Sequence, residues 1–139
     1  MVYEWVPVVT PSPYDTFNFD CNSGVAIAKG TLLQLLDEKR VGPTSGANQM
    51  VAGVAAMDKA SNDGTTTVSV WTRGVFDARA SGALVLGQGW ETAAQGNTIK
   101  GLTQFTASGA AIGGISWATA SAAEDVNVVL SPGLGGSRT

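Results

Sequence analysis

Few residues of this sequence could perform acid–base or nucleophilic chemistry. The 139 residues include no histidine, which excludes most catalytic triads, most zinc sites and the usual general base near neutral pH. Two carboxylate pairs, Asp37-Glu38 and Glu124-Asp125, could supply an acid and a base. Adjacent side chains on a strand point to opposite faces, however, and both pairs fall in predicted turns. We therefore interpret these carboxylates as solvated groups.

The remaining nucleophile and ligand candidates are equally isolated. Cys21 is the only cysteine, so no intrachain disulfide can form, and without an imidazole to activate it we predict a buried or incidental thiol. Residues 58–64 partly match a calcium loop, but Ala60 occupies a ligand position and Ser69 stands where the bidentate glutamate belongs. We predict no catalytic residue, no metal site, no cofactor and no enzymatic activity.

The charge content points toward a protein partner. Charged residues make up 14% of the chain and the net charge is −3, whereas about 25% charged residues is typical of soluble domains. The basic residues are scattered, so there is no basic stripe for nucleic acid. A neutral surface costs little to desolvate in a protein–protein contact.

A membrane partner is not expected either. Residues 101–123 carry no charge over the length of a membrane span. They are rich in Gly, Ser and Thr, so we interpret them as strand and loop. The N-terminus lacks the basic and apolar regions of a signal peptide, and the single cysteine fits folding in a reducing compartment.

Short apolar runs between turn residues predict an all-β fold, either a small β barrel, a β-tulip-like fold or a sandwich. Residues 65–72 alternate best, with Val68 and Val70 on one face. A bulge or bend is expected at Gly74. Residues 31–36 could form a helix or a strand, and their short length favours the strand. A second strand signal is the apolar run at residues 84–86.

Three segments are expected along the chain. Residues 1–22 form an extended N-terminal arm, because prolines between the aromatic residues exclude a helix or a central strand. Residues 23–133 form a single β domain, and residues 134–139 a flexible tail. The arm is either an edge strand folded on its own core or a segment that lies across a partner with its rings as anchors. The candidate contact residues are Tyr3, Trp5, Tyr14, Phe17 and Phe19.

Two further patterns leave alternatives open. Gly53-Val54-Ala55 followed by Val68-Ser69-Val70 is echoed by Gly114-Ile115-Ser116 followed by Val126-Asn127-Val128. This echo is either chance or a pair of similar hairpins in one sheet or barrel. Separately, Trp5, Trp71, Trp90 and Trp117 are either a sugar-binding platform or, as tryptophans more often are, core and interface residues.

The runs 26–33, 51–55 and 68–76, which include Val68-Ser69-Val70-Trp71-Thr72-Arg73-Gly74-Val75-Phe76, resemble tailed-phage head decoration (cement) proteins. The resemblance covers roughly residues 25–130. It implies a virion protein that is made in the host cytoplasm and lies on the outer capsid surface. There it would be a homotrimer that bridges major capsid proteins and stabilises the shell. The rival interpretations are another virion part, such as a head-fibre base or tail protein, and a carbohydrate-binding β module.

Overall fold

The computed structural model describes residues 4–8, 15–47, 49–102 and 113–132, and this part of the chain is all-β, as predicted. Its strands are β1 (Val6–Pro7), β2 (Thr16–Cys21), β3 (Leu32–Asp37), β4 (Arg40–Pro43), β5 (Val51–Ala55), β6 (Thr67–Trp71), β7 (Gly74–Ala80), β8 (Gly89–Thr92), β9 (Thr98–Gly101), β10 (Gly114–Ile115) and β11 (Asp125–Leu130). Over the described ranges, no helix is long and apolar enough to cross a membrane.

The first half of the chain is a closed barrel with the strand order β2-β4-β3-β5-β6. β2 pairs antiparallel with β6 and, at its end, parallel with β4, and the β5–β6 pair closes the barrel. The predicted alternation of β6 is confirmed, because Val68 and Val70 are buried between more exposed neighbours. The strand predicted at residues 31–36 is confirmed as β3.

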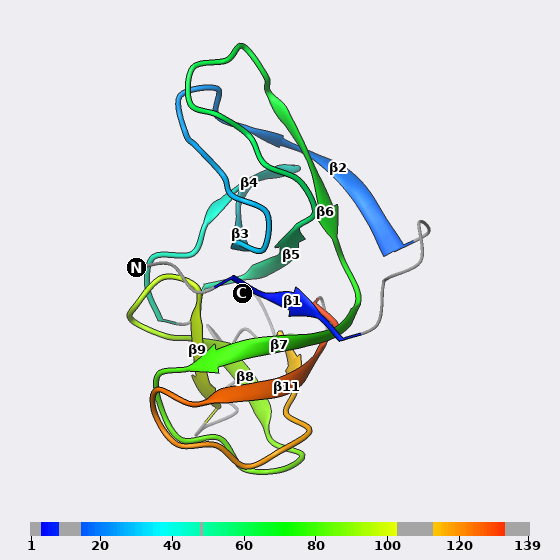
Figure 1. The fold of residues 1–139 in the computed structure, drawn as a ribbon. Coiled ribbons are helices and arrows are strands. Elements are labelled where there is room, and N and C mark those ends of the chain that lie inside the picture. Colours follow the sequence, from blue (N-terminus) through cyan, green and yellow to red (C-terminus); the bar gives the residue numbers. More distant parts are fainter. Residues whose placement is uncertain (1–3, 9–14, 48, 103–112, 133–139) are drawn as a thin grey trace.

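The second half repeats this connectivity in a curled sheet (Figure 1). β7 pairs antiparallel with β11 and parallel with β9, and β8 pairs antiparallel with both β9 and β10. A single bridge, between Ser116 and Val128, joins the β10 segment to β11. The equivalent strands of the barrel, β5 and β6, form a strand pair instead. The chain passes from barrel to sheet at Gly74 (φ 145°), where a bulge or bend was predicted.

Local details confirm that the two halves share one five-stranded connectivity. The bridge between Ile27 and Lys59 corresponds to the bridge between Leu84 and Ala120. The turns before β3 and β8 both contain a glycine with positive φ, Gly30 at 86° and Gly87 at 80°. The turns before β4 and β9 likewise end on Lys39 and Asn97, with φ of 57° and 67°.

The internal echo of the sequence is therefore real, but it is larger than the hairpins that suggested it. The two echoed segments are β5–β6 and β10–β11, and they lie in different sheets. Gly53 and Gly114 are equivalent within them. A Cβ on Gly53 would meet the backbone carbonyl of Trp71, and one on Gly114 would meet that of Val129. Each glycine thus allows its hairpin to close tightly.

Two apolar clusters hold the molecule together. One fills the barrel and includes Leu33, Val41, Val68 and Val70. The other fills the second half and extends to Leu32, Val51 and Val54 of the barrel strands β3 and β5. The outer face of these two strands therefore covers the open side of the second half. In Figure 1, β1 lies between the upper barrel and the lower sheet.

The structure shows where two parts of the predicted N-terminal arm lie. Residues 16–21 are β2, a strand of the barrel, so this part of the arm is folded on its own chain, one of the two alternatives that the sequence left open. β1 is also paired, with Val6 and Pro7 opposite Asp77 and Phe76 of β7. Within residues 23–133, predicted as a single β domain, β7 begins a second sheet beside the barrel. The strand expected at residues 84–86 needs correction, because Leu84 makes a one-residue bridge and a turn follows it. The tail at 134–139 lies outside the described residues.

Candidate partner-binding surfaces

The aromatic residues predicted to contact a partner lie in different environments. Trp5 is 1% exposed, with its ring 5.4 Å from that of Trp90 and 6.1 Å from that of Phe76. Its indole N–H donates to the carbonyl of Asn97 over 3.1 Å. Trp5 is therefore a core residue of its own chain, and in this structure it has no surface for a partner. Tyr3 and Tyr14 lie outside the described residues.

Phe17 and Phe19 remain available for contact. They stand opposite Val70 and Val68 in the β2–β6 pair, so their rings point toward the barrel interior, where residue pairs directly opposite share a face. Phe17 is nevertheless 49% exposed, because it lies at the open end of the barrel. The two rings meet edge to face at 4.9 Å. Their proposed contact with a partner stays a prediction.

An apolar groove of about 390 Å³ continues from Phe19 across the open end of the barrel. Leu35 of β3 and Met50 at the start of β5 line it, and the backbone N–H of Leu35 donates to the carbonyl of Met50. Arg73 and Pro132 lie at its border. We call the surface formed by Phe17, Phe19, Leu35 and Met50 the barrel mouth.

A second apolar surface lies on the outside of the second half. Leu86 is 66% and Trp117 53% exposed, and Val85 and Ile115 are exposed beside them. Backbone hydrogen bonds join the two segments, from Gly87 N–H to the Ser116 carbonyl and from Ser116 N–H to the Gln88 carbonyl. We call the surface formed by Val85, Leu86, Ile115 and Trp117 the wall patch. No signal in the sequence distinguished these residues from strand-forming core residues.

The four tryptophans do not share one exposed surface. Trp90 is fully buried and donates its indole N–H to the Val129 carbonyl over 2.9 Å. Trp71 is half-buried against Phe76, with the Lys29 ammonium 5.8 Å from its ring centre. The prediction that most tryptophans serve the core or an interface is confirmed for Trp5, Trp71 and Trp90. Trp117 alone of the four is largely exposed.

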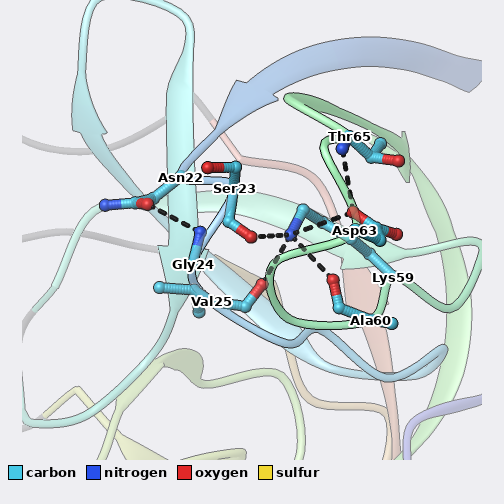
Figure 2. Close-up of polar contacts among 8 residues, drawn as sticks. All are labelled: Asn22, Ser23, Gly24, Val25, Lys59, Ala60, Asp63 and Thr65. Carbon is cyan, nitrogen blue, oxygen red and sulfur yellow. Dashed lines mark hydrogen bonds and ion pairs between the residues drawn. The ribbon is translucent and has the colours of Figure 1, made fainter.

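The most buried charge in the described part of the chain belongs to Lys59, within the segment that partly matched a calcium loop (Figure 2). Its ammonium donates to the carbonyls of Ser23, Val25 and Ala60 over 2.8–3.1 Å, and lies 3.9 Å from the Asp63 carboxylate. Three acceptors use all three N–H groups of the ammonium. Lys59 therefore ties two loops together and is not placed to act as a nucleophile.

The acidic residues of this segment serve its turns. The Asp63 carboxylate accepts the Thr65 N–H, and this hydrogen bond, together with nearby Lys59, lowers the pKa of Asp63 below its ordinary value despite some desolvation. The Asp58 carboxylate accepts the Lys29 N–H. The Asp63 contact is a side-chain-capped turn of the kind that aspartate favours, whereas the Asp58 contact joins two segments that are distant in the sequence. Within the ranges that the structure describes, no group of three His, Cys, Asp or Glu residues could hold a metal ion.

The other chemical candidates are also placed by the structure. Cys21 is buried, as expected, and burial raises the pKa of its thiol. Asp37 accepts the Glu38 N–H and Glu124 accepts the Ser121 N–H, so each caps a turn. Asp125 pairs with the guanidinium of Arg79 at 2.8 Å. The two carboxylate pairs of the sequence thus lie on separate halves of the molecule and face local backbone or arginine.

Comparison with known proteins places the fold. No protein-family model matches the chain, and no curated protein matches it. Among solved structures, the head fibre gp8.5 N base of bacteriophage phi29 has a TM-score of 0.53. The two chains are 17% identical, and the similarity covers 84% of this chain and 92% of that one. At this identity the comparison shows that the two proteins share a fold.

Proposed function

We propose that the chain is a structural component of a phage virion that attaches to the head through protein–protein contacts. The observation that carries the proposal is the fold shared with a phage head fibre base, over 92% of that chain. This neighbour favours the head-fibre base among the virion roles considered, whereas the short motifs that resemble decoration proteins favour a place on the shell itself. Both roles put the chain on the head.

The surfaces of the molecule suit such a role. The barrel mouth and the wall patch are apolar, and exposed apolar surfaces of this kind mark protein interaction sites. The acidic and basic groups described above are engaged in turns and loop contacts, and among the residues that the structure describes we find no constellation suited to catalysis. We accordingly propose that the chain has no enzymatic activity, and a broad hydrolase screen checks this.

The finer proposal is that the chain lies on the outer capsid surface as a homotrimer and bridges major capsid proteins. Many copies with modest individual affinity would then stabilise the shell through multivalency and mass action. If so, particles made without the chain should lose integrity at lower temperature, or at lower chelator concentration, than complete particles. Equal resistance of the two kinds of particle would exclude the stabilising role while leaving attachment intact.

Electron microscopy of labelled particles tests the broader proposal. A gold label on the chain should appear at the head, over the shell for a decoration protein or at the roots of projecting fibres for a fibre base. A label confined to the tail would contradict head attachment. Virions that lack the label altogether, in a preparation where the chain is expressed, would contradict a structural role in the particle.

The carbohydrate-binding alternative now depends on the ring of Trp117. Trp117 is exposed, but its neighbours in the wall patch are apolar, whereas sugar recognition also needs polar groups placed to bind hydroxyls. We expect tryptophan fluorescence to stay unchanged across a broad glycan panel. A saturable shift that disappears in Trp117→Ala would instead support a sugar site.

A further inference from the structure

The repeat makes it possible to compare each exposed surface with its equivalent in the other half. Inside the chain, the outer face of the barrel packs on the open side of the second half. Leu32 and Val54, paired across β3 and β5, belong to the same apolar cluster as Trp5 and Phe76. The first half thus contributes the outer face of its barrel, which we call its wall. The second half contributes the open surface that this face covers, which we call its mouth.

The wall patch is the equivalent of that buried wall. Ile115 stands opposite Gly89 in the β8–β10 pair, as Val54 stands opposite Leu32 in the β3–β5 pair. Val54 is fully buried, whereas Ile115 is 46% exposed. The outer face that is buried in the first half is therefore exposed in the second half. Trp117 and Leu86 enlarge its apolar area there.

The barrel mouth is likewise the equivalent of the buried mouth. Phe17 opposes Val70 on β6 as Phe76 opposes Val128 on β11. Phe76 is fully buried under Trp5 and the barrel wall, whereas Phe17 is half exposed. The molecule therefore carries one occupied wall-on-mouth interface inside the chain, and one unoccupied surface of each kind outside it.

We infer that copies of this chain associate head to tail, with the wall patch of one copy docked on the barrel mouth of the next. The occupant of the mouth is a second copy because the chain itself shows which surface such a mouth accepts. The interface is heterologous, so it closes into a ring when the rotation between copies allows and otherwise grows into a filament. The expected homotrimer would be a ring of three copies. The inference does not depend on attachment to a phage head.

Solution mass measured by light scattering over a concentration series tests the association. The unmodified chain should form assemblies larger than one copy as concentration rises from about 1 µM to about 1 mM. Trp117→Asp in the wall patch and Leu35→Asp in the barrel mouth should each weaken association about tenfold or more, because a buried unpaired carboxylate opposes docking. Val25→Asp, an exposed apolar position on neither surface, is the matched control and should associate normally.

Mixing the two interface variants distinguishes a head-to-tail contact from a symmetric one. The Trp117→Asp chain keeps an intact mouth and the Leu35→Asp chain keeps an intact wall, so their mixture should form a one-to-one dimer that grows no further. Leu86→Lys provides a second wall variant. Lys29 occupies the equivalent exposed turn position of the first half, so the fold accepts a lysine there.

Three results would overturn the inference. The first is a single-copy mass at every concentration. The second is normal association of the Trp117→Asp, Leu86→Lys and Leu35→Asp chains. The third is a mixture of folded wall and mouth variants that stays monomeric. The first and third results would leave head attachment untouched, because binding to phage heads is measured separately.

Discussion

Lys59 and Ala120 occupy equivalent bridge positions in the two halves, yet only Lys59 carries a charge. The difference follows from the loops around them, since the first half has longer turns with three carbonyls aimed at one point. An ammonium satisfies those carbonyls. Ala120 makes the same pair of backbone hydrogen bonds with Leu84 that Lys59 makes with Ile27, but it lies beside shorter turns. The sequence showed the aspartates of this segment and suggested a failed calcium loop, but it could not show that a lysine side chain fills it.

Replacing Lys59 by methionine should lower the free energy of unfolding by about 1–3 kcal/mol, because buried carbonyls lose a charged donor. The measurement is the midpoint of urea unfolding. Lys39→Met, which removes the same charge from an exposed turn, is the control and should shift the midpoint little. Equal midpoints for the two variants would show that the carbonyls are satisfied by water and that Lys59 does not tie the loops.

Trp5 and Phe17 were both predicted to anchor a partner, but Trp5 is buried whereas Phe17 is half exposed. Truncating Trp5 to alanine should cost about 3–5 kcal/mol, because it empties a filled core between the two halves. Truncating Phe17, half exposed at the barrel mouth, should cost less than about 1 kcal/mol. Chemical unfolding compares the two. If Trp5→Ala fails to fold, Trp5→Phe keeps most of the ring volume and should still be less stable than Phe17→Ala.

At the scale of strands and turns, the sequence was informative where residues alternate and uninformative where pairing is long-range. β6 and β3 could be predicted because β-branched or apolar runs of strand length end in clear turns. β2 was missed because it follows several prolines, although its own residues Thr16–Cys21 contain none. Its partners, β4 and β6, lie far along the chain, so no local pattern marks it as a barrel strand.

The size of the repeated unit could not be predicted from the sequence either. The positions that define it, such as Ile27 with Leu84 or Gly30 with Gly87, share size and backbone conformation more than residue identity. Side chains at equivalent positions differ in burial, because the outer face of the barrel is covered by the second half and the equivalent face of the second half is not. Thus Val54 is core and Ile115 is surface, and neither pattern nor composition predicts which copy is covered.

The two equivalent hairpin glycines give a prediction at this scale. Alanine at Gly53 or at Gly114 should destabilise the fold by about 1–3 kcal/mol or more, because the new methyl group would meet the carbonyl of the facing strand. Gly114 adds backbone strain, since its φ of 154° lies in a region that alanine disfavours. Gly24→Ala, which has ordinary room at 3.4 Å, is the control. Thermal unfolding that ranks Gly24→Ala with the other two would contradict the equivalence of the hairpins.

At the scale of the whole molecule, the structure is a closed barrel and a curled second sheet. One apolar cluster lies inside the barrel and a second joins the outer face of the barrel to the second half, and each half leaves an apolar surface exposed. Such an arrangement needs no catalytic group to be useful, because its surfaces can hold neighbouring proteins in register. The fold class was predictable from alternation and turn spacing, and the likeness to a head fibre base agrees with it. Phe17 and Phe19 of the barrel mouth were predicted from the sequence, whereas the wall patch and the relation between the two surfaces could be recognised only in the structure.

The most direct test of the account is cosedimentation of the purified chain with phage heads assembled without it. The account predicts saturable binding, with a plateau that corresponds to a fixed number of copies per head and that unlabelled chain competes away. The folded chain should show no such binding to unrelated particles of the same size. A folded chain that stays in the supernatant at every concentration, while the heads pellet intact, would contradict attachment to the head.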